Sequence, residues 1–328
     1  MSADPISFQT VLDALVDGKK DFPRRYLREF SDIAPLELKT VLDIWPSVTP
    51  SRKQALLEAL KTLAEADTLV SFDDFARALL TDPDPMVRTH AIRLLHESED
   101  LKLVPTYLDM LKDDSDSGVR REAANVLNLF VDLGELEEIP ENVYHQVEEA
   151  LLASANGEDD VRVRRTALES LGYSSRPEVI TLIESAFHRE DPHWQASALR
   201  AMGRSADDDR WTEDVLHSLV NDDDRIRRAA VEAAGELSIR PARSILLKML
   251  AEEEEPDVTS AVIWSLSQIG GEDVRTYLEN LLDQTDDDDQ IEFLEDALDN
   301  LAFTEDLDRF DLLAFDPEEN PLEEEDKQ

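Results

Sequence analysis

Asp-Pro-Met-Val-Arg-Thr-His-Ala-Ile-Arg-Leu-Leu, residues 84–95, is the stretch that decides the fold of this chain. Val87, Ala91 and Leu95 are four residues apart, so on an α-helix each lies about 40° from the last and the three form one buried stripe. The opening aspartate is a good N-cap, and the proline after it stands at the first helical position, which proline favours. The segment is therefore expected to be an amphipathic helix with a defined start.

The same stripe recurs eight times along the chain. We call its first position the anchor, and the anchors are Arg52, Val87, Val119, Val163, Trp194, Ile226, Val258 and Phe293. They are separated by 35, 32, 44, 31, 32, 32 and 35 residues. Four positions after the anchors stand mostly small residues: Leu56, Ala91, Ala123, Ala167, Ala198, Ala230, Val262 and Ala297. A small residue in the middle of the stripe allows a neighbouring helix to approach closely.

The predicted helix starts recur in the same register. The residues three before the anchors are Thr49, Asp84, Asp116, Asp160, Asp191, Asp223, Glu255 and Gln290. Most are good N-caps, and four are followed by a proline: Pro50, Pro85, Pro192 and Pro256. Nine positions after their anchors lie Gly172, Gly203 and Gly235, which suit either a left-handed helix end or a tight helix crossing.

A second helix is expected after each anchor helix. It is indicated by the apolar runs Val104–Leu111, Val179–Phe187, Ala242–Leu250 and Val274–Leu282. No alternating β-branched run interrupts the helical pattern. A period in the low thirties with two helices in it is typical of stacked helix pairs. The sequence therefore predicts an all-α fold, a right-handed α-solenoid (superhelix) of about eight helix pairs.

Residues 84–95 resemble the first helix of a HEAT-like repeat of the phycobilisome-lyase type. Asp160–Gly172 and Asp223–Gly235 match the same pattern, and the resemblance covers roughly residues 49–302. Proteins similar to this type include interaction scaffolds, chromophore lyase subunits, a class of DNA glycosylase and a metal-dependent hydroxylase. The resemblance thus implies the fold and leaves the function open.

The repeat pattern also predicts the domain organisation. Residues 1–48 are expected to be an N-terminal helical cap, with helical patterns at Phe8–Val16, Tyr26–Phe30 and Leu36–Trp45. Residues 49–314 are expected to be one solenoid, whose 44-residue step hides an insertion near 131–142, read as a longer loop in the third repeat. Residues 303–314 add a last amphipathic helix, and 315–328 are an acidic disordered tail.

The formal net charge of −43 is the second strong feature of the sequence. It argues against binding of DNA or RNA, because neutralising phosphates requires clustered Lys and Arg, and it disfavours anionic membrane surfaces. Three readings of the charge stay open: a well-solvated surface, adaptation to high salt, or recognition of a basic protein partner by electrostatic attraction. The balance of nine lysines to 24 arginines suits the second reading.

Compartment and membrane signals point to the cytoplasm. The chain has no cysteine, so disulfides and thiolate metal sites are excluded. Its start, Met-Ser-Ala-Asp-Pro, lacks the basic and apolar regions of a signal peptide, and no apolar run is long enough to span a bilayer. A cytoplasmic location is therefore expected.

An arginine follows four of the anchors directly. These are Arg88, Arg120, Arg164 and Arg227. A cation in the first turn of a helix is disfavoured by the helix dipole, and acidic runs precede most anchor helices. We expect these arginines to form a ladder with carboxylates of adjacent repeats.

Catalytic and metal sites are not supported by the sequence. Asp113–Gly118 resembles the start of a calcium loop, but the twelfth position is Ala124 instead of a bidentate glutamate. Only His96 is followed by a glutamate, so the His-Glu pairs of the related hydroxylases are missing, and no two histidines have a zinc spacing. The acidic charge argues against a glycosylase. No catalytic residue, metal or cofactor is expected.

A partner is expected on the second helices, which in this architecture usually line the concave face. Candidate contacts are aromatic residues, arginines and equivalent acids on those helices: Tyr107, Glu184, Trp211, Arg243, Arg275 and Glu279. Trp211 is expected to be exposed, whereas Trp194 and Trp264 belong to the anchor helices and are expected in the core.

The sequence favours a non-catalytic scaffold or adaptor that binds a protein partner on its concave face. One alternative is a subunit of a phycobilin lyase or a related enzyme, with a protein substrate and a tetrapyrrole on the concave face. A weaker alternative is an acidic mimic of nucleic acid that occupies a basic protein.

Overall fold

The structure is a computed structural model that describes residues 7–205, 207–253 and 255–314. The chain divides between Ser174 and Ser175 into two compact units. The described part of both units is helical and contains no strand. The first unit holds α1(Phe8–Val16), α2(Pro35–Ile44), α3(Pro50–Ala66), α4(Asp73–Leu79), α5(Pro85–Leu94), α6(Val104–Asp113), α7(Ser117–Val126), α8(Asn128–Glu135), α9(Glu141–Asn156) and α10(Val161–Ser170). The second unit holds α11(Pro177–Phe187), α12(Pro192–Arg204), α13(Asp208–Ser218), α14(Asp224–Glu236), α15(Arg243–Glu252), α16(Pro256–Ile269), α17(Glu272–Leu282) and α18(Asp288–Ala314).

Eight of these helices carry the predicted anchors: α3, α5, α7, α10, α12, α14, α16 and α18. Their starts follow the predicted chemistry, because the side chains of six predicted caps accept backbone N–H groups of the first turn: Thr49, Asp84, Asp116, Asp160, Asp191 and Asp223. Glu255 is an N-cap without such a bond. The prediction that Gln290 is an N-cap was wrong, because α18 starts earlier and the Asp287 carboxylate accepts the Gln290 N–H at 3.0 Å.

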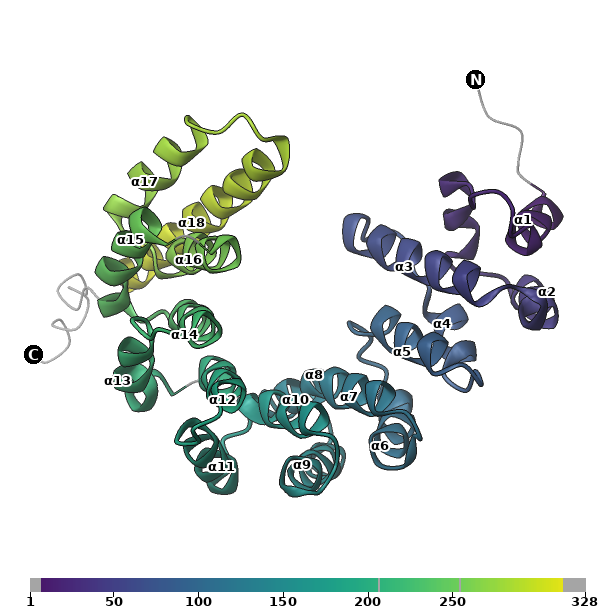
Figure 1. The fold of residues 1–328 in the computed structure, drawn as a ribbon, viewed down its shortest axis with the longest axis horizontal. Helices are drawn as coiled ribbons and strands as arrows, with labels where there is room; N and C mark the ends of the chain where they lie inside the picture. The colour runs from purple at the N-terminus through teal and green to yellow at the C-terminus, as the bar shows by residue number, and fades with distance from the viewer. Residues whose placement is uncertain (1–6, 206, 254, 315–328) are drawn as a thin grey trace, which may run out of the picture. The chain divides into compact units, whose positions relative to one another are not determined.

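The anchor helices of each unit stack on one another in one layer. In the first unit α3, α5, α7 and α10 pack in sequence, and in the second α12, α14, α16 and α18 do the same (Figure 1). In the other layer, the anchor helices pack more on the helix before them than on the helix after them, as in the pairs α6–α7, α11–α12, α13–α14 and α15–α16. The expected pairing with the helix that follows was therefore wrong. The all-α solenoid is confirmed, while the right-handed sense of the whole array stays a prediction.

Small residues allow the close approach of α12, α14 and α16. A Cβ added to Gly203 would lie 2.9 Å from the Ala233 Cα atom, and one added to Gly235 would lie 2.8 Å from the Ser265 Cα atom. Real Cβ atoms do not come that close to backbone, so these two glycines serve a tight helix crossing. The Ser265 hydroxyl donates to the Val231 carbonyl at 2.8 Å and joins the same two helices.

Neighbouring repeats are also joined along the edge where the anchor helices begin. Arg88 donates from Nε and Nη2 to the two Asp114 carboxylate oxygens at 2.8 and 2.7 Å, and from Nη1 to the Asp82 carbonyl at 2.8 Å. The Asp114 carboxylate in turn accepts the Asp116 N–H at 2.9 Å, just before α7. One guanidinium thus connects the loop before its own helix to the loop before the next anchor helix.

The same arrangement is repeated twice. Arg120 pairs with Asp159, with an Nε–Oδ2 distance of 2.7 Å, and Arg227 pairs with both oxygens of Glu253 at 3.0 and 3.1 Å. At the fourth position, the Arg164 Nε donates to the Ala155 carbonyl at 3.2 Å. These bonds compensate each guanidinium for its unfavourable place in the first helical turn.

The segments outside the repeat pattern differ in part from expectation. The helical patterns of the N-terminal region are confirmed by α1, α2 and the 3₁₀ segment Arg24–Phe30. The insertion is not a simple loop, because its first part belongs to α8, where the Tyr144 ring covers Gly134. Residues 303–314 are not a separate helix but the end of α18. The predicted acidic tail, 315–328, lies outside the described residues. None of the described helices combines the length and the apolar character that crossing a bilayer requires.

Replacing Gly235 by alanine tests the tight crossing of α14 and α16. Alanine favours a helix by about 1 kcal/mol over glycine, but its Cβ would overlap the Ser265 backbone. We expect a net loss of about 1–3 kcal/mol in the free energy of unfolding, the usual cost of overpacking, measured by urea denaturation. Gly18→Ala is the control, because its Cβ would meet only Thr49 side-chain atoms at 3.7 Å or more. A more stable Gly235→Ala protein would contradict the crossing.

Replacing Arg120 by glutamine tests the hydrogen bonds that join the starts of neighbouring anchor helices. The Arg120 guanidinium holds the pKa of Asp159 below its ordinary value, so the pair stabilises the fold above the unfolded pKa of about 4 and loses this effect as the pH falls further. We expect a loss of about 1–2 kcal/mol at pH 7 that shrinks between pH 4 and pH 2. In the control Arg162→Gln, the side chain is 59% exposed, and we expect a change below about 0.5 kcal/mol. Equal losses at pH 7 and pH 2 would contradict this account.

Candidate interaction surface

Two hollows open on the anchor-helix layers, one in each unit. The first, of about 700 Å³, is lined by α3, α5 and α7 and by residues that directly follow α5. The second, of about 240 Å³, is lined by α14 and α16 alone. Neither takes a lining residue from the other helix layer.

Equivalent positions of the repeat line both hollows. Residues three, six and ten positions after an anchor lie about 60–120° to one side of the buried stripe, so they share one flank of the helix. In the first hollow these are Glu58, Thr62, His90, Arg93, Glu97, Glu122 and Asn125. In the second they are Glu232, Glu236, Ala261, Trp264 and Gln268. We call this flank the anchor-helix face.

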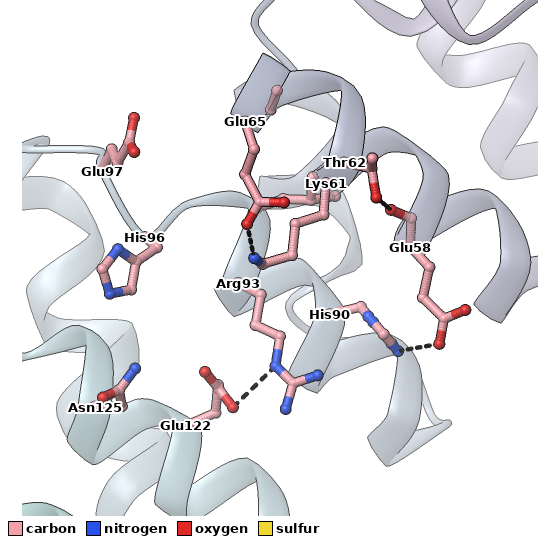
Figure 2. Close-up of a pocket in the computed structure, with 12 residues that line it drawn as sticks. Glu58, Lys61, Thr62, Glu65, His90, Arg93, His96, Glu97, Glu122 and Asn125 are labelled. Atoms are coloured by element: carbon pink, nitrogen blue, oxygen red, sulfur yellow. Dashed lines mark hydrogen bonds and ion pairs between the residues drawn. The ribbon is translucent and has the colours of Figure 1, made fainter. Parts of the chain in front are cut away.

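Charged residues of neighbouring helices meet across the first hollow (Figure 2). The Arg93 Nε of α5 lies 3.0 Å from the Glu122 Oε2 of α7, and the His90 Nε2 lies 3.9 Å from the Glu58 Oε1 of α3. Lys61 pairs with Glu65 one turn further along α3. The hollow is thus lined by groups of both charges.

His90 is the most buried ionisable residue of the first hollow. Only 7% of the residue is exposed, and its Nδ1 atom has no hydrogen-bond partner among the described residues. Burial, followed by the positive charge of Arg93, lowers the pKa of His90, against the opposing effect of Glu58 and Glu122. The imidazole is therefore neutral at neutral pH.

The second hollow combines an aromatic ring with charged groups. Trp264 of α16 is 40% exposed, so its expected place in the core was wrong. On α14, the Arg228 Nε donates to the Glu232 Oε1 at 2.8 Å, and the Arg228 Nη1 lies 3.2 Å from the Asp257 Oδ2. Trp264 stands six residues after its anchor, Val258. That position lies on the anchor-helix face and not in the buried stripe, which explains the exposure of the ring.

The two aromatic residues named as partner contacts are in the core. Tyr107 of α6 has no exposed surface, and Trp211 of α13 is 2% exposed, so its expected exposure was wrong. Its helix α13 packs on α14, so the first turns of α13 contribute to the core of the second unit. Neither side chain is available to a partner in this structure.

The four charged candidates are bound within the second unit or exposed on its other layer. The Arg243 Nη1 donates to the Gly270 carbonyl at 3.3 Å, and the Arg275 Nη2 lies 2.7 Å from the Glu305 Oε2. Glu184 is exposed at 3.6 Å from Arg210, and Glu279 is exposed on α17.

The helix layer that carries these candidates is less closely packed than the layer of anchor helices. Among the described residues, successive helices of the layer α11, α13, α15 and α17 make no contacts comparable to those between α12, α14, α16 and α18 (Figure 1). A two-layered stack curves toward its more closely spaced layer. The concave side of this unit therefore belongs to the anchor helices, and its expected assignment to the second helices was wrong.

No metal site is present in the part of the chain that the structure describes, where no three His, Asp or Glu side chains gather around one point. The calcium-like aspartates have other roles, since Asp116 caps α7 and Asp114 binds Arg88. What the anchor-helix face offers chemically is a set of charged and amide groups and one exposed indole ring.

A family model described as HEAT repeats matches residues 72–139, 148–234 and 212–299, which is more than half of the chain. A HEAT repeat-containing taxis protein of Halobacterium salinarum is 27% identical over 142 residues, which are 42% of this chain and 35% of that protein. The chain thus spans about a third of the length of this relative.

Among solved structures, the complex of CpcE and CpcF of phycocyanin lyase from Nostoc sp. PCC7120 contains a similar chain. Its TM-score is 0.52 at 18% identity, and the match covers 92% of this chain and 97% of that one. The similarity at this level shows a common fold.

Replacing His90 by glutamine tests the state of the first hollow. Because the pKa of His90 is lowered in the folded protein, the unfolded chain takes up a proton first as the pH falls below about 6.5. The free energy of unfolding should therefore fall between pH 7 and pH 5 in the wild type, and less in His90→Gln. The exposed His217 supplies the control His217→Gln, which should follow the wild type. An unchanged slope in His90→Gln would contradict the neutral imidazole.

Proposed function

Because this chain belongs to the HEAT repeat family, we propose that it is a non-catalytic scaffold that binds a protein partner on its anchor-helix face. The observation that carries this proposal is that equivalent repeat positions line a hollow in each unit. A surface built from repeated positions suits an extended macromolecular partner.

The chemistry of the two hollows supports a binding role. In the first, the Thr62 hydroxyl donates to the Glu58 carbonyl of its own helix at 3.1 Å and is not oriented by His90. In the second, the Ser265 hydroxyl donates to the Val231 carbonyl, and no histidine lines the hollow. Neither of these two hydroxyls has the adjacent base that activates a hydroxyl as a nucleophile.

The experiment described below also tests two other functions. The likeness to the CpcE and CpcF complex is a likeness of fold, and it supports a chromophore-lyase subunit only to that extent. The charge of −43 is the support for an acidic mimic of nucleic acid. The taxis relative makes signalling proteins of taxis the first partner class to screen.

Two exposed aromatic residues on opposite layers of the second unit provide the test. Trp264 on α16 is 40% exposed and Tyr277 on α17 is 47% exposed. Wild type, Trp264→Ala and Tyr277→Ala are immobilised, source-cell lysate is passed over them at low salt, and proteins eluted by rising KCl are identified by mass spectrometry. We expect one stoichiometric partner that wild type and Tyr277→Ala retain and that Trp264→Ala loses.

Other outcomes separate the alternatives. Loss of the partner from Tyr277→Ala alone would place binding on the other layer. A broad set of basic proteins that elutes at modest salt from all three columns would contradict a specific scaffold, and displacement of DNA from them would favour the mimic. A change in the visible absorbance of added phycocyanobilin would favour the lyase subunit.

A further inference from the structure

Trp264 is exceptional among the four tryptophans of the chain. Trp45, Trp194 and Trp211 are 4%, 4% and 2% exposed, whereas Trp264 is 40% exposed. Exposing a large aromatic side chain to water is unfavourable. Tryptophans are nevertheless enriched at surfaces where protein partners bind.

The two sides of this indole differ. On the side of α18, the ring lies against Phe293, with a centroid distance of 6.5 Å and an interplanar angle of 31°. On the side of α14, it lines the hollow of about 240 Å³ together with Gln268. This hollow is below the roughly 300–1,000 Å³ of sites for drug-sized ligands, and its volume suits a single side chain.

The charge around the hollow is negative. Its lining contains the carboxylates of Glu232, Glu236 and Asp257 and the guanidinium of Arg228. The Arg200 Nε of α12 also donates to the Glu232 Oε2, at 3.2 Å. Arg228 already binds Glu232 and Asp257, which leaves Glu236 at the end of the hollow where Gln268 lies in the equivalent position of α16. The two guanidiniums neutralise two of the three carboxylates, and the third, Glu236, is the group that attracts a cation. Burial raises the pKa of Glu236, and the positive charges of Arg204 and Arg200 oppose this effect.

We propose that this hollow seats an arginine side chain of the protein partner, stacked on Trp264 with its guanidinium directed to Glu236. The proposal rests on the scaffold function above and specifies the partner chemistry at one site. A guanidinium is planar, stacks on an indole face by cation–π attraction and binds a carboxylate with two parallel hydrogen bonds. A lysine ammonium is more strongly hydrated and lacks this planar fit.

The four indole N–H signals of the full-length ¹⁵N-labelled protein provide the test, with Trp264→Phe to assign the relevant one. The probes are the peptide acetyl-Gly-Ser-Arg-Ser-Gly-amide and the same peptide with citrulline, an uncharged isostere, or with lysine in place of arginine. We expect the arginine peptide to shift the Trp264 signal saturably, with at least tenfold weaker binding of the citrulline peptide and several-fold weaker binding of the lysine peptide.

Two matched variants locate the carboxylate. Glu236→Gln removes one charge from the hollow at constant volume and should weaken the arginine peptide several-fold. Glu279→Gln makes the same change on the exposed face of α17 and should bind as the wild type does. Unchanged signals of the three buried indoles show that each variant is folded.

Equal binding of the arginine and citrulline peptides, or shifts of all four indole signals, would overturn the proposal. Equal effects of Glu236→Gln and Glu279→Gln would also overturn it, because the charge effect would then be a general one. The scaffold function is judged separately by capture. A partner lost from Trp264→Ala without arginine-peptide binding would refute this inference alone, and the converse result would refute the scaffold alone.

Discussion

The structure depends on the short distance between successive anchor helices. Gly203 and Gly235 face the backbone of Ala233 and Ser265 so closely that no Cβ fits between them. With the helices this near, their small stripe residues are fully buried, and the flank beside the stripe lies at the surface of each unit. Close packing of this layer also sets the direction in which the second unit curves. The proposed interaction surface is therefore a consequence of the same small residues that hold the stack together.

The charged groups divide into two sets with different environments. At the helix starts, arginines such as Arg88 and Arg227 are engaged on both sides by a carbonyl and a carboxylate, with little exposed surface. In the two hollows, Arg93 and Arg228 keep a third or more of their side chain in solvent. A partner can compete for the second set without disturbing the first. Under the proposed function, binding and stability thus depend on different charges, although both sets follow the same repeat.

The periodicity of the sequence correctly predicted the local features of each helix. It did not predict the features that depend on distances between helices. The anchors, the prolines and six caps follow from the spacing of side chains within a single helix, and the structure has them where expected. The curved side could not be read in the same way, because it depends on which layer is more closely spaced. The predictions for Trp211 and Trp264 were wrong for a related reason. Trp211 was expected at the surface and lies in the core, whereas Trp264 was expected in the core and is exposed. The position of Trp264 six residues after its anchor was the available signal, and it would have placed this ring on the face.

The bonds at the helix starts have a consequence for how such a chain can change its length over evolutionary time. The arginine donor stands one residue after an anchor, and its acceptor, as with Asp114 and Glu253, stands five residues before the next anchor. A duplicated segment of one period that holds both such an arginine and such a carboxylate therefore contains a donor for the copy that follows and an acceptor for the copy that precedes. Gene duplication or deletion of one period would join compatible ends without inventing a new interface. Repeat number is thus free to vary, while the chemistry of each junction stays the same.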